Sequence, residues 1–112
     1  MRADLIRGHL EMLVLSTITS GAGHGYAIVE ELRRRSDGEF DLPEGTVYPA
    51  LYRLESSGLL RSEWQSVSGR RRRVYGLTPA GRKALARKAR EWDLFIAAVA
   101  RVVGRVAWAG ES

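Results

Sequence analysis

Apolar residues recur at helical spacing in the first part of the chain. Residues 5–18, with the sequence LIRGHLEMLVLSTI, are apolar around most of the helix that they would form. Such a helix must be covered on most sides, which places it at the centre of the fold or in a contact between subunits. The glycines of TSGAGHG then predict a turn. A second helix is expected over 26–36, YAIVEELRRRS, which ends in three arginines.

The next segment, residues 43–58, predicts a third helix that ends at Gly58. Its inward stripe has the spacing i, i+3, i+4, i+7 and consists of Val47, Ala50, Leu51 and Leu54. The same rotation leaves a polar and aromatic set facing outward: Thr46, Tyr48, Pro49, Tyr52 and Arg53. A proline inside a helix clashes with the carbonyl four residues earlier, so Pro49 either kinks the helix or lies in its first turn. We favour a start near Gly45 or Thr46, which places Pro49 in the first turn.

From Leu60 the pattern changes from the period of a helix to that of a strand. In LLRSEWQ, Leu60, Ser62 and Trp64 alternate with polar residues, and RRVYGL (72–77) is a second strand candidate. The glycine-containing segment SVSGRR between them predicts the turn of a β-hairpin. Because of the alternation, we expect Trp64 to face inward and to belong to the core.

The segment after the hairpin predicts a long final helix. Thr78 is a typical N-cap and Pro79 is tolerated at the first helical position. We expect this helix to continue to about Trp108, with an apolar seam near coiled-coil spacing. The predicted class is therefore mainly α with a small β-hairpin: a winged helix-turn-helix with a three-helix core, a two-stranded wing and a long C-terminal dimerisation helix. We expect residues 1–78 to form the winged helix-turn-helix domain and residues 79–112 to form the dimerisation helix packed on it.

The composition is that of one small basic domain. The chain has 112 residues and a net charge of +5, and its pI of about 10.2 lies in the range typical of nucleic-acid-binding domains. A chain this short buries a limited core, which favours completion of that core by a partner subunit. Arginines far outnumber lysines, which occur only at 83 and 88. A coding bias and selection for phosphate or guanine contacts explain this ratio equally well.

Several other classes of protein are disfavoured. The absence of cysteine excludes disulfides and thiolate chemistry. The N-terminus lacks the features of a signal peptide, and Arg101 and Arg105 interrupt the apolar C-terminal run. We therefore expect a cytoplasmic protein without a membrane partner. His9 and His24 have no partner at metal-ligand spacing and no catalytic motif is present, so we expect neither a metal, nor a cofactor, nor an enzyme.

Charge gathers beside the predicted helix-turn-helix. Arg70, Arg71, Arg72 and Arg73 stand together on the hairpin, and no acidic residue lies between Glu63 and Glu91. A run of like charge is usually a solvated surface, and the tyrosines of the third helix could simply cover the core. Beside a helix-turn-helix, however, an arginine-rich hairpin is typical of a wing that follows DNA phosphates. The three arginines 33–35 would add to this sequence-independent affinity.

Four stretches of the chain resemble one family. LIRGHLEMLVL, GHGYAIVEEL, GTVYPALYRLESSGLL and GRRRRVYGLTPAGRKAL, which extend from about Leu5 to Leu85, resemble the PadR-like winged-helix transcriptional regulators. Of these, GTVYPALYRLE is the most specific. The resemblance implies a dimer, usually a repressor, that is joined through its first and last helices. It also implies that the helix with Tyr48 enters the major groove of double-stranded DNA, and the single final helix is similar to that of the smaller relatives.

The resemblance implies three groups of site residues. The DNA-binding group is His24, Tyr26, Thr46, Tyr48, Pro49, Tyr52, Arg53, Arg70, Arg71, Arg72 and Arg73. The dimer interface is Leu10, Leu13, Leu94, Phe95, Val99, Val102, Val103 and Val106. The candidate pocket for a small aromatic effector is Trp92, Phe95 and Ile96, although the same residues would also suit a closed dimer seam. The chain departs from the family at Arg71, where many relatives carry proline, and at Gly76, where a larger side chain is common.

The sequence thus favours a homodimeric repressor that binds a palindromic operator and is released by a small aromatic ligand. Its two recognition helices would enter successive major grooves about 34 Å apart. The alternative is a winged helix that docks an acidic protein partner. Binding to double-stranded DNA at two salt concentrations distinguishes these two functions.

Overall fold

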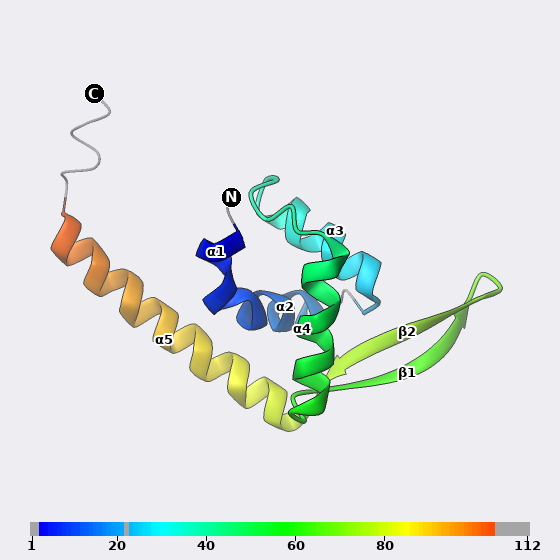
Figure 1. Cartoon of the computed structure of the whole chain (residues 1–112). Coiled ribbons are helices and arrows are strands. Elements are labelled where there is room, and N and C mark those ends of the chain that lie inside the picture. Colours follow the sequence, from blue (N-terminus) through cyan, green and yellow to red (C-terminus); the bar gives the residue numbers. More distant parts are fainter. Residues whose placement is uncertain (1–2, 22, 105–112) are drawn as a thin grey trace.

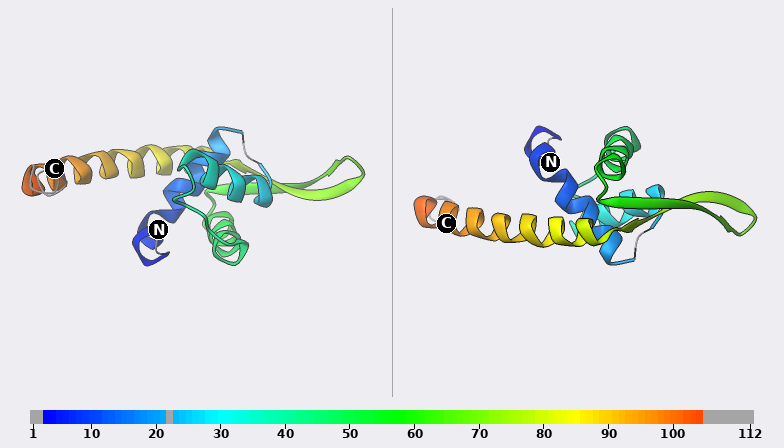
Figure 2. Two further views of the ribbon diagram at one scale, coloured as in Figure 1. Left: turned by 90° about the horizontal axis from the view of Figure 1, so that it is seen from above. Right: turned by 90° about the horizontal axis from the view of Figure 1, so that it is seen from below.

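The computed structural model describes residues 3–21 and 23–104. A body of short helices carries a β-hairpin on one side and a long helix on the other (Figure 1), and the two views of Figure 2 show that these projections point in opposite directions. The predicted mainly α class with a small hairpin is confirmed. The elements are α1 (Ala3–Ile6), η1 (Arg7–His9), α2 (Leu10–Thr19), α3 (Gly25–Arg35), α4 (Glu44–Ser56), β1 (Leu60–Val67), β2 (Arg70–Leu77) and α5 (Pro79–Val103).

The first helical segment is central, as expected, but it is not one helix. A short 3₁₀ turn at η1, which contains Gly8, separates α1 from α2, in keeping with the low helix propensity of glycine. Helix α2 packs against α3, α4, α5 and β2, and Val14 and Leu15 are fully buried. The buried Thr17 hydroxyl donates to the Val14 carbonyl at 2.7 Å, so its burial leaves no polar group unsatisfied.

Helix α4 begins one residue earlier than predicted. Its first residue is Glu44 and its N-cap is Pro43, so Pro49 lies in the second turn and the expected place in the first turn is wrong. The missing N–H of Pro49 falls on the outer side of the helix, where both Pro49 and Gly45 are exposed, and therefore no buried carbonyl loses its partner. The inward stripe is confirmed, because Val47, Ala50, Leu51 and Leu54 are all buried.

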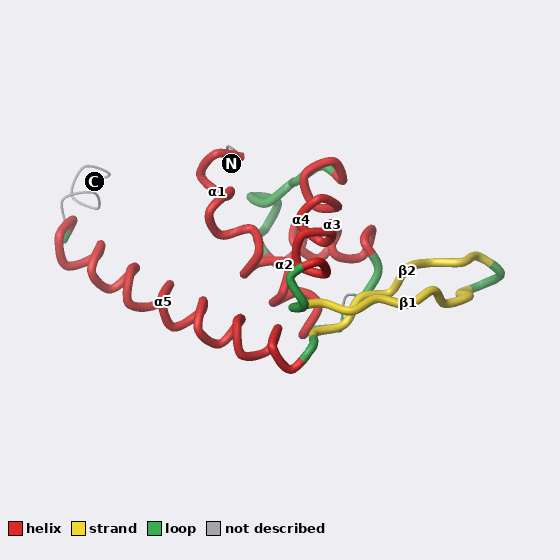
Figure 3. Tube along the Cα trace, turned by 60° about the horizontal axis from the view of Figure 1, so that its bottom comes forward, coloured by secondary structure: helices red, strands yellow, loops and turns green. Residues whose placement is uncertain are grey.

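Strands β1 and β2 form an antiparallel hairpin whose register runs from Leu60 opposite Leu77 to Val67 opposite Arg70. The two loop residues, Ser68 and Gly69, have φ angles of 52° and 77°, as a tight hairpin turn with right-handed twist requires. The tube in Figure 3 shows that most of the hairpin extends beyond the helices. The expected core position of Trp64 is therefore wrong: its side chain is 55% exposed, because no helix covers the inward face at that distance from the body.

Helix α5 is anchored firmly at its first turn. The Thr78 hydroxyl accepts from the Gly81 N–H at 3.0 Å and donates to the Gly58 carbonyl at 2.6 Å, which confirms the predicted N-cap. A Cβ on Gly81 would collide with the Leu59 carbonyl, so only glycine permits this close approach. The helix ends at Val103, and residues 105–108 of the expected helix lie outside the described residues. Among the helices that the structure describes, none is long and apolar enough to cross a membrane.

Candidate nucleic-acid interface

The start of α3 is held by two contacts, one to α4 and one to the hairpin. The Tyr48 ring of α4 lies directly over Gly25, because a Cβ on Gly25 would be 2.5 Å from the ring atoms of Tyr48. On the other side, His24 forms an isolated β-bridge with Val74 of the hairpin. The helix-turn-helix and the hairpin are thus joined at one point.

A groove of about 620 Å³ opens where α3, α4 and the hairpin meet. It brings together most of the predicted DNA-binding residues and adds two aromatic side chains, Trp64 and Tyr75, that sequence reasoning did not assign to the site. For Trp64, the alternation of β1 was the available signal, because it placed this side chain on the inward face of the hairpin, which lines the groove. The groove is lined by His24, Gly25, Tyr26, Tyr48, Trp64, Arg70, Arg71, Arg72, Arg73 and Tyr75.

The four hairpin arginines do not act as one cluster, because neighbouring residues of a strand face opposite sides of the sheet. Arg71 and Arg73 lie on the face of Trp64, with their guanidinium carbons 5.2 and 5.5 Å from its ring centroid. Arg70 and Arg72 belong to the other face, and the Arg72 Nη1 lies 3.0 Å from the His24 Nε2.

His24 has an environment that favours the neutral ring. Its Nδ1 accepts from the Ala27 N–H at 3.2 Å, which caps the start of α3. Its Nε2 lies close to the Arg72 guanidinium. A neutral imidazole accepts at only one of its two nitrogens, so with Nδ1 as the acceptor the Nε2 carries the proton and faces the guanidinium charge without accepting from it. Burial, and next the charge of Arg72, lower the pKa of His24 below its ordinary value of 6.5. A helix N-terminus with an adjacent guanidinium is a favourable site for a phosphate group.

The tyrosines of this region differ in their roles. Tyr48 is partly covered by Gly25, and burial, and next the carboxylate of Glu44, raise the pKa of its hydroxyl. The hydroxyl therefore stays protonated and can donate a hydrogen bond. Tyr52 is 73% exposed on the outermost side of α4, and Tyr26 is exposed at the start of α3. These two rings are free for contact with a partner.

The remaining residues predicted on α4 do not join this groove. Thr46, Pro49 and Arg53 line a separate hollow of about 500 Å³ between α4 and the α1–η1 segment. Tyr48 and Arg53 are five residues apart, which corresponds to about 140° around the helix. The predicted outward set of α4 therefore occupies two flanks of the helix, with Tyr52 between them.

The arginines at the end of α3 are partly neutralised. Arg33 pairs with Glu30, and Arg34 pairs with Glu31 through two hydrogen bonds of 2.9 and 2.8 Å. These ion pairs reduce the positive field that the end of α3 offers to a phosphate backbone. The hairpin and the start of α3 form the stronger positive surface.

The outer part of α5 carries an apolar face that no other described part of the chain covers. Phe95, Val99 and Val103 follow each other at helical spacing and are exposed, as is Val102. Leu94 is also exposed, but it lies about 140° around the helix from Val99. We call Phe95, Val99 and Val103 the apolar ridge of α5.

The other predicted interface and pocket residues differ in their exposure. Ile96 is exposed near the apolar ridge, and Leu13 packs partly buried against the core. Leu10 is only 5% exposed, so it belongs to the core of its own chain and has little surface left for a partner. Val106 lies outside the described residues.

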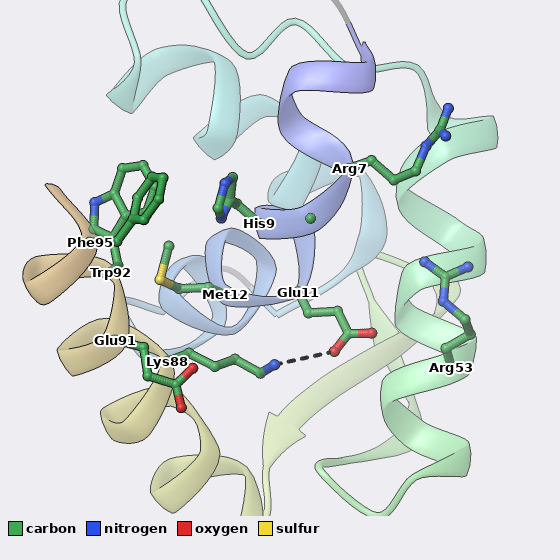
Figure 4. Close-up of a pocket in the computed structure, with 10 residues that line it drawn as sticks. Arg7, His9, Glu11, Met12, Arg53, Lys88, Glu91, Trp92 and Phe95 are labelled. Carbon is green, nitrogen blue, oxygen red and sulfur yellow. Dashed lines mark ion pairs between the residues drawn. The ribbon is translucent and has the colours of Figure 1, made fainter. Parts of the chain in front are cut away.

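A third hollow, of about 460 Å³, lies between η1, α2 and the middle of α5 (Figure 4). The His9 and Trp92 rings meet edge to face with their centroids 4.7 Å apart, and the Phe95 ring is 6.0 Å from Trp92. Trp92 and Phe95 line this hollow as predicted, whereas Ile96 is not among its lining residues. His9 was not predicted here. The Lys88 Nζ lies 3.7 Å from the Glu11 Oε1, and the hollow is otherwise bordered by Arg7, Arg53 and Glu91.

No group of three His, Cys, Asp or Glu side chains with metal-binding geometry occurs in residues 3–21 and 23–104.

Comparisons with known proteins identify the family of the chain. Residues 14–87 match the family model described as the transcriptional regulator PadR-like family. A transcriptional regulator from Mycobacterium tuberculosis is 43% identical over 79 residues, which cover 70% of this chain and 71% of that protein. A solved transcriptional regulator from Clostridium thermocellum is 32% identical with a TM-score of 0.83, covering 92% of this chain and 98% of that chain. A PadR family transcription regulator from Clostridium difficile R20291 is 35% identical with a TM-score of 0.78, covering 87% and 100%.

Proposed function

Because the chain belongs to the PadR-like family of transcriptional regulators, we propose that it is a homodimeric, sequence-specific DNA-binding repressor of the cytoplasm. One observation carries this proposal: the start of α3, the tyrosine-bearing helix α4 and the arginine-rich hairpin meet around one positively charged groove. A dipole end, guanidinium groups and hydroxyls on one side of a small protein suit the phosphates and base edges of a duplex.

In the proposed complex, α4 enters the major groove with Tyr52 foremost. Tyr48 on one flank and Thr46 with Arg53 on the other then face the two walls of the groove, where hydroxyl and guanidinium groups read base edges. His24 and the hairpin arginines contact phosphates and supply affinity that does not depend on sequence.

The proposed dimer is supported by the exposed apolar ridge on α5. A ridge of Phe95, Val99 and Val103 is costly to leave in water. Pairing of two α5 helices about a two-fold axis buries both ridges and sets the distance between the two copies of α4. A palindromic operator would match this symmetry, with half-sites about 34 Å apart.

The proposed control acts through the Trp92 hollow. It is lined by aromatic rings that suit a flat aromatic ligand, and it also contacts Arg53 of α4. The hollow therefore borders both α5, which would join the subunits, and α4, which would read DNA. Such a ligand releases the operator only if it binds more tightly to a dimer geometry that does not fit the DNA.

Selection of bound fragments from genomic DNA, followed by fluorescence anisotropy at two salt concentrations, tests the proposal. We expect tight binding to the selected fragments, weaker binding to random duplex, and a steep loss of affinity at the higher salt concentration. Absence of duplex binding in dilute buffer contradicts the proposal. Binding to acidic polypeptides but not to DNA would instead support a protein-docking module.

A further inference from the structure

Trp64 is a large aromatic side chain in a place that packing does not explain. It lies on β1 at the part of the hairpin that extends beyond the helices, and 55% of its surface is exposed. A hydrophobic side chain in this position adds little to the core. Its contacts instead involve charge, because the guanidinium groups of Arg71 and Arg73 lie over its ring at 5.2 and 5.5 Å.

The strand register produces this arrangement. Arg73 is directly opposite Trp64, and Arg71 is the diagonal neighbour on the same face of the hairpin. Cations are attracted to the face of an indole ring when they lie within about 6 Å of its centroid. One ring therefore contacts two arginines whose like charges repel each other, and it restricts the side chains of both.

Helix α4 fixes one end of this cluster. The Glu55 Oε2 accepts from the Ser62 hydroxyl at 2.6 Å and lies 3.5 Å from the Arg73 Nη2. A chain of side-chain contacts therefore runs from Glu55 on α4 through Arg73 and Trp64 to Arg71 on the outer hairpin. These contacts connect the two hairpin arginines to the helix that would read the bases.

We propose that Trp64 is a positioning residue for DNA binding, which holds the Arg71 and Arg73 side chains extended across the inward face of the hairpin before the duplex arrives. This inference rests on the proposed DNA-binding function. A free arginine has many rotamers, and ordering it on a phosphate costs affinity. A ring that already restricts two arginines reduces this cost, and because the indole is uncharged it does not itself neutralise them. Arg71 keeps its full charge for the duplex, whereas Arg73 is partly neutralised by Glu55.

A set of Trp64 variants tests this role by anisotropy on a selected duplex. Trp64→Leu, which keeps an apolar side chain but removes the aromatic face, should weaken binding roughly 3- to 30-fold. Trp64→Phe and Trp64→Tyr should restore most of the affinity, because a smaller aromatic face remains. The salt slope of Trp64→Leu should equal that of the wild type, because the same phosphates are still contacted.

A double-mutant cycle separates positioning from direct contact. In a protein that already carries Arg71→Ala and Arg73→Ala, Trp64→Leu should have no further effect on DNA affinity. If Trp64→Leu weakens binding as much in that background as in the wild type, Trp64 itself contacts the duplex. If Trp64→Leu alone leaves the affinity unchanged, Trp64 positions nothing. Either result overturns the inference. Failure of the wild-type protein to bind any duplex would instead contradict the proposed function.

A measurement without DNA tests the geometry itself. In the NMR spectrum of the free protein, ring currents of Trp64 should shift the side-chain Nε–H signals of Arg71 and Arg73, assigned by their lysine variants. Trp64→Leu should remove these shifts while the backbone amide signals of α2 and α4 stay in place. Arginine signals that do not change on this substitution contradict the inference, even if the hairpin of Trp64→Leu proves less stable.

Discussion

At the scale of single residues, the interface depends on the missing side chain of Gly25 and on the two ring nitrogens of His24. Gly25 allows the Tyr48 ring to lie against the start of α3, so the position of this tyrosine is set by the absence of a Cβ. His24 caps the same helix turn with one ring nitrogen and faces Arg72 with the other. The start of α3 therefore contacts both the Tyr48 ring and the Arg72 guanidinium, two groups on the surface that would face the DNA.

Gly25→Ala tests the first of these contacts. The added methyl group would displace the outer part of the Tyr48 ring, which can swing toward solvent, so the free energy of unfolding should change by less than about 1 kcal/mol. Operator affinity should fall roughly tenfold, as in Tyr48→Ala. The double variant should bind no more weakly than Tyr48→Ala. Additive losses in the double variant, or a similar loss in Gly8→Ala, whose Cβ would meet nothing, would contradict this role.

His24 predicts a pH dependence of stability. Because its pKa is lowered in the folded protein, the unfolded chain takes up a proton first as the pH falls below the ordinary value of 6.5. Its contribution to stability is thus complete above about pH 6.5 and is lost as the pH falls from there toward the folded-state pKa. Urea unfolding at several pH values should show this loss in the wild type and a smaller loss in His24→Asn, which keeps an N-cap acceptor. Parallel pH profiles for the two proteins would contradict the prediction.

At the scale of elements, hydrophobic periodicity predicted the hairpin, the inward stripe of α4 and the helices, except that it did not show the break at η1 in the first of them. Burial on one face of an element produces a regular spacing of apolar residues in the sequence. The alternation of β1 also predicted the correct face for Trp64. It could not predict its exposure, since alternation does not tell how far the helical body extends along the hairpin. The division of the arginines between Trp64 and His24 depends on the strand register, and the separation of Tyr48 from Arg53 depends on which neighbours flank α4. Neither is encoded by local spacing.

The hairpin face that carries Arg70 and Arg72 predicts a salt effect. Replacement of both by alanine should reduce the slope of log affinity against log salt by up to about 1.8, since each lost phosphate contact removes about 0.9. Affinity should fall on selected and random duplexes alike. Arg90→Ala, an exposed arginine on α5, is the matched control and should leave the slope unchanged. Equal slopes for the hairpin variant and the wild type would remove this face from the interface.

At the scale of the whole molecule, the two projections have complementary chemistry. The hairpin and α5 extend to opposite sides of the molecule (Figure 1). The hairpin carries the four arginines, and α5 carries the exposed apolar ridge of Phe95, Val99 and Val103. The small helical body between them carries α4. This division suits a protein that binds an anion with one part and a second copy of itself with another.

Val99→Asp tests the apolar ridge. A carboxylate in the middle of the proposed seam would face its symmetric partner, and like charges in a buried contact are costly. Sedimentation should therefore show a monomer, whereas the wild type should sediment as a dimer. Ala97→Asp introduces the same charge about 160° away around α5 and should remain dimeric. Dissociation of both variants, or of neither, would show that this ridge does not form the interface.

In the proposed complex, two copies of this chain place α4 and its hairpin against one side of a duplex. Hydroxyl-radical footprinting on the tightest-binding genomic fragment measures this arrangement directly. We predict two protected patches on the same side of the DNA, with centres one helical turn, about 34 Å, apart. A single patch, patches on opposite sides, or no protection in dilute buffer would contradict this arrangement.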